Sequence, residues 1–384
     1  MEAKSFSDLI SFSRASVARY FNSAGLMIQA AVNEPRFEFD PGTLDPLGLK
    51  MEPQRTNSLT YSQDFSNAAW VKTRTAVSGA SAAPDGTNTA QTITLNDATG
   101  SNYLYRTGVA WTAGTVYTLS CYAKAGNQSI ISLQLNPGGF GSNQQINFDL
   151  SGNGSFVVVA GTPIGRIEKL ANGWFKCSVT QTATTTTAAA NWIVISQPKA
   201  LNNSYLLWGM QLEIGAGATS YIPTTATTAT RNSDVASVDT LSPWLLAGQG
   251  TLYTEVVANG GQSFHGSLGG ANGSGPRIAN WRGAAGNPGS QVIQDDFSVA
   301  FAYSAIAVSN GAILKQALAY SLNDFQAAAQ GALSAVDTSG MPPTLSRLSI
   351  GSRGSGTDAM SGYVRKIQYL PYRLSASELQ AITT

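Results

Sequence analysis

Charge is scarce in this chain. Lys, Arg, Asp and Glu make up 12% of its 384 residues, about half of the ~25% that is typical of globular proteins. The formal net charge is +1 and the charged residues are scattered singly. No basic stripe is present that could neutralise nucleic-acid phosphates or hold the chain on an acidic membrane surface. We therefore expect no nucleic-acid partner and no electrostatic attachment to membranes.

Long apolar runs are absent as well. No run reaches the ~18 apolar residues of a membrane-spanning helix. The N-terminus, MEAKSFSDLISFSRASVARYF, lacks a basic segment followed by a long apolar one, which is the pattern of a secretory signal. We expect no membrane insertion, and synthesis in the cytoplasm.

Histidine is nearly missing. The one histidine, His265, excludes a zinc site built on several histidines. A Ser-His-Asp triad would have to use His265, and no GxSxG motif surrounds a serine near it. The Gly- and Ser-rich sequence around His265 indicates an exposed loop residue.

Cysteine occurs twice, as Cys121 and Cys177, both in strand-like segments without CxxC or Cys/His spacing. This context predicts two buried free thiols. A disulfide between them is the alternative.

Short segments of alternating polar and apolar residues are abundant, and they are bounded by Gly, Asn and Pro. Three segments, 117–123, 174–179 and 206–214, each place a row of alternate residues on one face of a strand, which we expect to face the core. The rows are Tyr117, Leu119, Cys121 and Ala123; Phe175, Cys177 and Val179; and Leu206, Trp208, Met210, Leu212 and Ile214. Many short strands at close spacing predict an all-β chain of two tandem β-sandwiches of the jelly-roll kind. Ser375 and Glu378 form a capping-box pattern, which predicts a short C-terminal helix.

Composition divides the chain into four parts. Residues 1–57 are proline-rich with weak periodicity, which predicts an irregular segment that packs on a neighbour or attaches the chain to a larger assembly. Residues 58–222 form the first sandwich. The Thr/Ala-rich stretch 223–236 reads as a linker, and 237–384 form the second sandwich.

Residues 12–57 read FSRASVARYFNSAGLMIQAAVNEPRFEFDPGTLDPLGLKMEPQRTN. This segment resembles one that recurs in structural proteins of phages and prophages. The residues that fit are Arg14, Ala15, Ser16, Tyr20, Gly25, Asn33, Pro35, Arg36, Phe37, Gly48, Glu52, Arg55, Thr56 and Asn57.

Further segments are similar to the same group. Residues 211–234 (QLEIGAGATSYIPTTATTATRNSD) match its junction motif, and 346–383 look like the last strands of a laminin-G or concanavalin-like sandwich. Residues 67–70 (NAAW), 84–94 (PDGTNTAQTIT) and 117–126 (YTLSCYAKAG) resemble carbohydrate-binding-module jelly rolls. The resemblance thus covers nearly the whole chain.

The resemblance implies a non-enzymatic component of a bacteriophage virion, such as a tail fibre, a tail tip, or a capsid fibre or decoration protein. It implies that the chain is located in the virion and contacts other virion proteins. It also implies a homo-oligomer, with a trimer favoured because phage fibres and tips are commonly three-fold.

Sugar recognition needs an exposed aromatic platform rimmed by amide and hydroxyl groups. Aromatic residues near predicted strand ends and loops are the candidates, with core packing as the alternative for each. They are Tyr103, Tyr105, Trp111, Trp192 and Trp281.

Oxygen ligands for a structural Ca²⁺ are also present. In some carbohydrate-binding jelly rolls the loop that corresponds to PDGTN (84–88) binds calcium, so Asp85 and Asn88, with Glu213, are candidate ligands. A plain turn is the simpler explanation of the loop. We expect no other cofactor.

Three functions remain open. The first is adhesion to host cell-surface polysaccharide through one or both sandwiches. The second is a purely structural role in decoration or assembly without sugar binding. The third, a glycan depolymerase, needs two convergent carboxyl groups. Asp295 and Asp296 do not provide them, because adjacent residues of a strand point to opposite faces.

Overall fold

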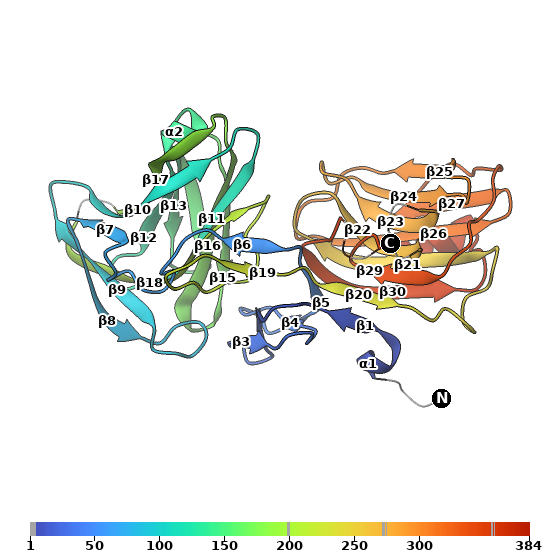
Figure 1. The fold of residues 1–384 in the computed structure, drawn as a ribbon, viewed down its shortest axis with the longest axis horizontal. Coiled ribbons are helices and arrows are strands. Elements are labelled where there is room, and N and C mark those ends of the chain that lie inside the picture. The colour runs from blue at the N-terminus through green and yellow to red at the C-terminus, as the bar shows by residue number, and fades with distance from the viewer. Residues whose placement is uncertain (1–4, 198–199, 271–272, 274, 355, 357) are drawn as a thin grey trace.

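The computed structural model describes residues 5–197, 200–270, 273, 275–354, 356 and 358–384. It is nearly all β and contains two sandwiches, as the sequence predicted. Figure 1 shows them side by side, joined by the strands β6 and β19, with the N-terminal residues lying next to this junction. None of the helices described here is long and apolar enough to cross a membrane.

The first sandwich contains two antiparallel six-stranded sheets. One sheet has the order β14 (Ser155–Ala160), β13 (Gln144–Asp149), β12 (Ile130–Leu135), β17 (Thr187–Gln197), β10 (Asn102–Trp111) and β7 (Trp70–Thr73). The other has the order β15 (Ile164–Lys169), β16 (Trp174–Thr182), β11 (Val116–Ala125), β18 (Ala200–Ile214), β9 (Ala90–Asp97) and β8 (Thr75–Ser81).

Strand β11 shows how the alternation in the sequence produces the core. Leu119, Cys121 and Ala123 are completely buried between the two sheets. Cys121 lies directly opposite Cys177 of β16, and both thiols are free and buried. Tyr122, on the opposite face of β11, is also buried, in a separate apolar cluster that covers the outside of this sheet. Both faces of β11 are therefore covered.

The second sandwich contains two seven-stranded sheets. One has the order β1 (Ser11–Ser13), β20 (Val235–Val238), β29 (Arg347–Ile350), β22 (Ser263–Gly269), β23 (Arg277–Arg282), β24 (Pro288–Ile293) and β25 (Val299–Ser304). The other has the order β28 (Ala332–Leu333), β27 (Asp324–Ala329), β26 (Ile313–Ser321), β21 (Gly250–Ala258), β30 (Gly362–Leu370), β5 (Pro46–Met51) and β4 (Phe37–Phe39).

The N-terminal segment 1–57 has more regular structure than the irregular segment that the sequence predicted. β1 extends one sheet of the second sandwich, and β5 and β4 extend the other, while β2 (Ala18–Phe21) and β3 (Met27–Ala30) form a hairpin. β5 can approach β30 closely because Gly48 has no side chain: a Cβ there would lie 2.5 Å from the Val364 carbonyl oxygen. These strands are short and pair with residues far along the chain, so local periodicity does not reveal them.

The first sandwich is an insertion in the second. The chain leaves β5, enters the first sandwich through β6 (Arg55–Asn57) and returns through β19 (Ala229–Arg231), which pairs with β6. It then continues into β20 of the second sandwich. The stretch 223–236, expected to be a linker, therefore carries one strand of a two-stranded connector and the first half of β20.

Helices are few among the described residues. They are α1 (Phe6–Leu9), α2 (Pro137–Phe140), the 3-10 turn η1 (Ala171–Gly173) and α3 (Ala376–Thr383). α3 is the predicted C-terminal helix, and both halves of its capping box, between Ser375 and Glu378, are formed. Leu379 of α3 packs in a buried cluster with Leu374 and residues of β21, β26 and β27. This helix covers the outer face of the second sandwich.

A buried ion cluster holds the junction together. Asp234, just before β20, accepts hydrogen bonds from Arg14 (3.0 Å) and Arg36 (2.5 Å), and from the backbone N–H of Glu52 (2.8 Å). The Glu52 carboxylate in turn lies 2.8 Å from Arg36 and 3.4 Å from Arg231. All five side chains are almost completely buried. They come from the N-terminal segment, the end of β5 and the returning chain, so the cluster ties these three segments together.

The environment of Glu52 keeps it charged. Burial raises the pKa of this carboxyl group, but Arg231 and Arg36 outweigh burial and hold the pKa well below its usual value. Two hydrogen bonds from Ser220, from its N–H and its hydroxyl group, both at 2.7 Å, stabilise the carboxylate further. Each charge of the cluster is thus paired and hydrogen-bonded, which is the condition for tolerating it in the interior.

We predict that Asp234→Asn lowers the free energy of unfolding by about 3–5 kcal/mol, because it leaves two buried guanidinium groups short of a charge partner. Urea unfolding followed by tryptophan fluorescence would measure the loss. Asp239→Asn is the matched control: its side chain is 51% exposed and pairs with Arg347, so its loss should stay below about 1 kcal/mol. Equal, small losses in both variants would contradict this role of Asp234.

Candidate functional site

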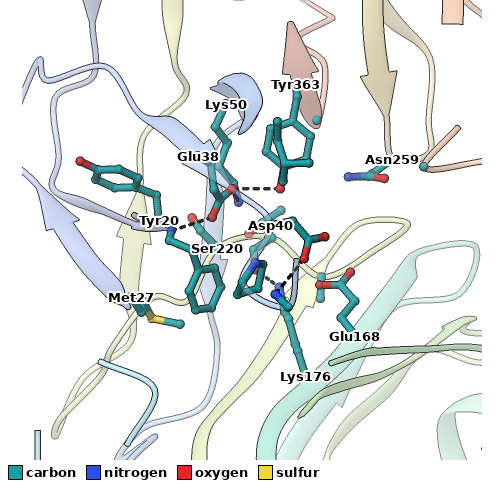
Figure 2. A pocket seen from close by; sticks show the side chains of 18 of the residues that line it. Tyr20, Met27, Glu38, Asp40, Lys50, Glu168, Lys176, Ser220, Asn259 and Tyr363 are labelled. Carbon is teal, nitrogen blue, oxygen red and sulfur yellow. Dashed lines mark hydrogen bonds and ion pairs between the residues drawn. The ribbon is translucent and has the colours of Figure 1, made fainter. Parts of the chain in front are cut away.

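A cavity of about 560 Å³ lies where the N-terminal segment and the two sandwiches meet. Figure 2 shows the three sources of its lining: Glu38 and Lys50 from the N-terminal segment, Glu168 and Lys176 from β15 and β16, and Tyr363 from β30. This volume lies within the range of ordinary small-molecule sites. The same packing that places the N-terminal segment between the sandwiches forms the walls.

On the side of the N-terminal segment the charges are satisfied within the protein. Glu38 pairs with Lys50 and accepts hydrogen bonds from the Tyr363 hydroxyl group (2.9 Å) and the backbone N–H of Phe21 (3.0 Å). Lys50 also lies over the Tyr363 ring, 5.4 Å from its centroid. Burial, followed by the charge of Glu38, raises the pKa of Tyr363 well above its usual value, so this phenol stays protonated. Glu38 and Lys50 on this side of the cavity are therefore paired without a ligand.

On the side of the first sandwich, hydrogen-bonding capacity remains. The Lys176 ammonium group donates to the Thr219 carbonyl oxygen at 2.9 Å, and no carboxylate of the described residues lies within ion-pair distance of it. Burial lowers the pKa of Lys176, while Glu168 opposes that change. An ammonium group has three donors, so two remain for a ligand.

Glu168 provides acceptors near Lys176. Its carboxylate lies 2.6 Å from the guanidinium group of Arg166 on the same strand. Burial raises the pKa of Glu168, but Arg166 and then Lys176 outweigh burial, so the pKa lies below its usual value. Arg166 also donates to the Asn259 side chain of the second sandwich at 3.2 Å. The carboxylate is therefore ionised and held in place by a contact that links the two sandwiches.

Tyr122 contributes a hydroxyl group to the same wall. The residue is 2% exposed, and its ring packs edge-on against Trp208 and Tyr221. Within the part of the chain that the structure describes, its hydroxyl group forms no hydrogen bond. Burial raises its pKa well above the usual value, so it can both donate and accept. Tyr122, Lys176 and Glu168 together offer donors and acceptors to one ligand.

The residues predicted to form a sugar platform do not gather at this cavity. Trp111 is completely buried in the core of the first sandwich, edge-on to Tyr117 and Phe140, so it cannot form an exposed platform. Tyr103 and Tyr105 are half-buried, two residues apart on β10. Trp192 lies on β17, and its side chain falls outside the described residues.

Trp281 belongs to the second sandwich, far in the fold from the other candidates. It lies on β23, is half-buried and stacks on Phe264 at 6.5 Å between ring centroids. Its ring packs over Gly289, where a Cβ would lie 2.5 Å from the indole. The candidates are thus spread over two sandwiches, and only Tyr103 and Tyr105, among those whose side chains are described, share a face, that of β10 next to β17.

The candidate calcium ligands are engaged with other groups. Asp85 accepts hydrogen bonds from the backbone and hydroxyl groups of Thr87 and pairs with Arg19 at 3.3 Å. Glu213 is buried and accepts from Thr219, and Asn88 is exposed. Among the described residues, no group of three His, Cys, Asp or Glu side chains is arranged to hold a metal ion. Calcium binding stays a sequence-based expectation.

Sequence reasoning missed Tyr122, Lys176 and Glu168, although one signal was present. Tyr122, Trp174 and Trp208 are large aromatic residues on the strand faces that point away from the core of the first sandwich. Aromatic residues on both faces of a strand indicate that both faces are covered. The outer cover is the β2–β3 hairpin, which supplies Phe21 and Met27 to the same cluster.

Comparisons with known proteins assign no family. No family model matches the chain, and no curated protein matches it. The chain is similar to a solved carbohydrate-binding module, CBM40, of the Ruminococcus gnavus IT-sialidase bound to α2,3-sialyllactose: 18% identity, 36% of this chain, 84% of that one and a TM-score of 0.32.

Two other solved structures are similar over part of the chain. A heptameric SAP-like pentraxin from Limulus polyphemus shows 13% identity over 36% of this chain and 70% of that one, with a TM-score of 0.30. Domains LG4-5 of the mouse laminin α1 chain show 9% identity over 73% of this chain and 89% of that one, with a TM-score of 0.26. At scores this low, these likenesses carry no argument about function.

The environment of His265 corrects the sequence-based prediction of an exposed loop residue. His265 lies on β22 and is completely buried in the second sandwich. Gln316 donates its amide hydrogens to the Trp281 and Gly289 carbonyl groups, so its oxygen, 2.7 Å from His265 Nδ1, must accept. Nδ1 therefore carries the proton, and burial lowers the pKa of the imidazole to about 4. The flanking Gly266 lies close to β21: a Cβ there would lie 3.0 Å from the methyl group of Thr254.

The lowered pKa gives a testable pH dependence. Between pH 6.5 and 4 the unfolded chain binds a proton at His265 that the folded chain does not, so stability is full above about pH 6.5 and falls as the pH falls. We predict a loss of about 3 kcal/mol over this interval that is absent in His265→Gln. Urea unfolding of the wild type and of His265→Gln from pH 7 to 4 would measure both stabilities. Because the two proteins share all their carboxyl groups, the difference between their stabilities reports on His265 alone. Parallel curves would show that His265 titrates normally.

Proposed function

We propose that the chain is a non-enzymatic structural protein of a phage particle that adheres to a host-surface glycan, and that a saccharide unit of this glycan binds in the junction cavity. The observation that carries the saccharide part is the spare hydrogen-bonding capacity of Lys176, Glu168 and Tyr122. The phage part rests on the resemblance of the junction sequence to structural proteins of phages.

A saccharide matches this combination of groups. A sugar hydroxyl group donates and accepts at once, so it can accept from the Lys176 ammonium group and donate to the Glu168 carboxylate or to the Tyr122 oxygen. Tyr20 and Phe21 also line the cavity and add apolar surface for sugar C–H groups. A ligand with only acceptors or only donors would leave one of the protein groups unpaired, at a cost of about 1–3 kcal/mol.

The charges of the lining favour a neutral saccharide. The cations and carboxylates are nearly balanced, and most are paired within the protein. The cations are Arg19, Lys50, Arg166, Lys169 and Lys176, and the carboxylates are Glu38, Asp40, Glu52 and Glu168. A strongly anionic or cationic ligand would meet as much repulsion as attraction.

The same geometry argues against a depolymerase. A glycosidase needs one carboxyl group that keeps a proton near neutral pH and can donate it to the leaving group. The pKa values of Glu168 and Glu52 are lowered, so both are ionised. Glu38 is held by Lys50 and by the Tyr363 hydroxyl group. These carboxylates are suited to binding and poorly suited to acid catalysis.

A purely structural role is the second candidate, and the edge strand β14 favours it. Its sequence, SFVVVA, has no charged residue, and Val157 and Val159 are exposed. Unprotected apolar edges of this kind pair readily with other chains. Cryo-electron microscopy of the particle separates the candidates: adhesion requires the junction cavity to face outward, and a structural role requires β14 to contact a neighbour. The number of subunits, expected to be three, would be visible in the same map.

We predict that Lys176→Met weakens saccharide binding roughly ten- to hundredfold, and Tyr122→Phe roughly two- to tenfold, since the first removes a charged hydrogen bond and the second a neutral one. A glycan array identifies the oligosaccharide, and titration calorimetry then measures the affinity. Lys124→Met is the control, because Lys124 lies two residues after Tyr122 on β11 but does not line the cavity.

Two results would overturn the saccharide proposal. One is a broad glycan array to which the intact protein does not bind. The other is a glycan that binds wild type, Lys176→Met and Tyr122→Phe equally well, which would place the sugar elsewhere on the molecule.

A further inference from the structure

A second, smaller cavity lies beside the connector. It has a volume of about 280 Å³ and is bordered by Arg55 of β6, by Ala216 and Gly217 after β18, and by the turn 259–262 that joins β21 to β22. It shares only Asn259 and Ser361 with the larger cavity. All three parts of the chain that meet at the junction therefore contribute to it.

Arg55 stands out among the arginines of the junction because it has no carboxylate partner. Its Nη1 donates to the Gln54 carbonyl oxygen at 2.9 Å, and its Nε is buried without a hydrogen-bond partner. No carboxylate among the residues described lies within 4.0 Å of its guanidinium group, whereas Arg14, Arg36 and Arg231 all have one. Its charge is therefore only partly compensated.

The neighbouring carboxylates are already shared. Asp234 serves Arg14 and Arg36, and Glu52 serves Arg36 and Arg231, so three guanidinium groups use two carboxylates. Burial lowers the pKa of Arg55, with Glu213 opposing this effect from a greater distance. The protein thus gives Arg55 a partly desolvated site without a counter-ion in contact, which is costly unless a ligand supplies one.

The turn 259–262 adds uncommitted donors. Gly260 and Gly261 both have positive φ angles, +82° and +76°, and a Cβ built on Gly261 meets nothing within 4 Å. In the described structure, the backbone N–H groups of residues 260–262 donate to no acceptor. Backbone N–H groups in such turns commonly bind anions. The one carboxylate on the lining, Asp358, is paired with Arg353 at 2.8 Å and adds little repulsion.

We propose that this cavity binds an oxyanion, a carboxylate or sulfate group, which accepts hydrogen bonds from the guanidinium group of Arg55 and from the turn 259–262. A planar guanidinium group matches a carboxylate or sulfate in bidentate geometry. The oxyanion belongs either to a substituent of an acidic saccharide or to a free inorganic ion. The inference does not depend on saccharide binding in the larger cavity.

The test uses crystals of the full chain soaked in selenate, whose anomalous scattering locates the ion. We expect a peak within hydrogen-bonding distance of Arg55 in the wild type and no peak there in Arg55→Gln. In solution, sulfate titrated against chloride at constant ionic strength should raise the melting temperature of the wild type in a saturable way, with at least tenfold weaker binding in Arg55→Gln. Arg74→Gln, at a 43% exposed arginine that pairs with Asp97, is the control.

The outcomes are decisive even if Arg55→Gln does not fold. Wild-type crystals without a selenate peak at Arg55, or a folded Arg55→Gln that binds sulfate as the wild type does, would overturn the proposal. Displacement of selenate by glucuronate would assign the site to the carboxylate of an acidic sugar. Retention of selenate against glucuronate would assign it to an inorganic ion.

Discussion

The fold depends on the carboxylate of Asp234. It binds Arg14 and Arg36, and through Arg36 it connects to Glu52 and Arg231. The N-terminal strands also pair with β20 and β30 and bury Leu49 and Met51 in the second sandwich, and the cluster adds charged contacts that join them to the returning chain. The larger cavity exists only while those strands stay in place, because they form one of its walls. The larger proposed ligand site therefore relies on a set of charges of which only Glu52 lines it.

The sequence predicted the fold where the information was local. Alternation within β11 and β16 identified these strands and their core faces, and Ser375 with Glu378 identified α3. In β18 the expected single core row was wrong: the strand is irregular at Gly209, so Trp208 packs in the outer cluster while Met210 and Leu212 face the core. The pairing of β1 with β20 and of β5 with β30 joins residues more than 200 positions apart. Three- to six-residue strands carry too little periodicity to predict such pairs, so the N-terminal segment was expected to be irregular.

The candidate sites were harder to predict because they form between parts of the chain. Lys176 and Glu168 are single charged residues on ordinary strands, and only the packing of the N-terminal segment turns them toward a cavity. Trp111 looked suited to a sugar platform because it ends a strand, yet its large apolar ring is better buried in the core. Several residues that carry the phage resemblance, among them Arg14, Arg36 and Glu52, build the ion cluster of the junction. Of the residues that fit the resemblance within 12–57, Tyr20 and Glu52 line the larger cavity.

The insertion of the first sandwich has a mechanical consequence. Because β6 and β19 both enter it from the second sandwich and pair antiparallel, a pull on the first sandwich loads both strands at once (Figure 1). Each strand then continues into a different sheet of the second sandwich, β6 from β5 and β19 toward β20. Tension is divided between two sheets instead of peeling one strand from an edge, so a tethered first sandwich can resist force that would unravel a module attached by a single chain.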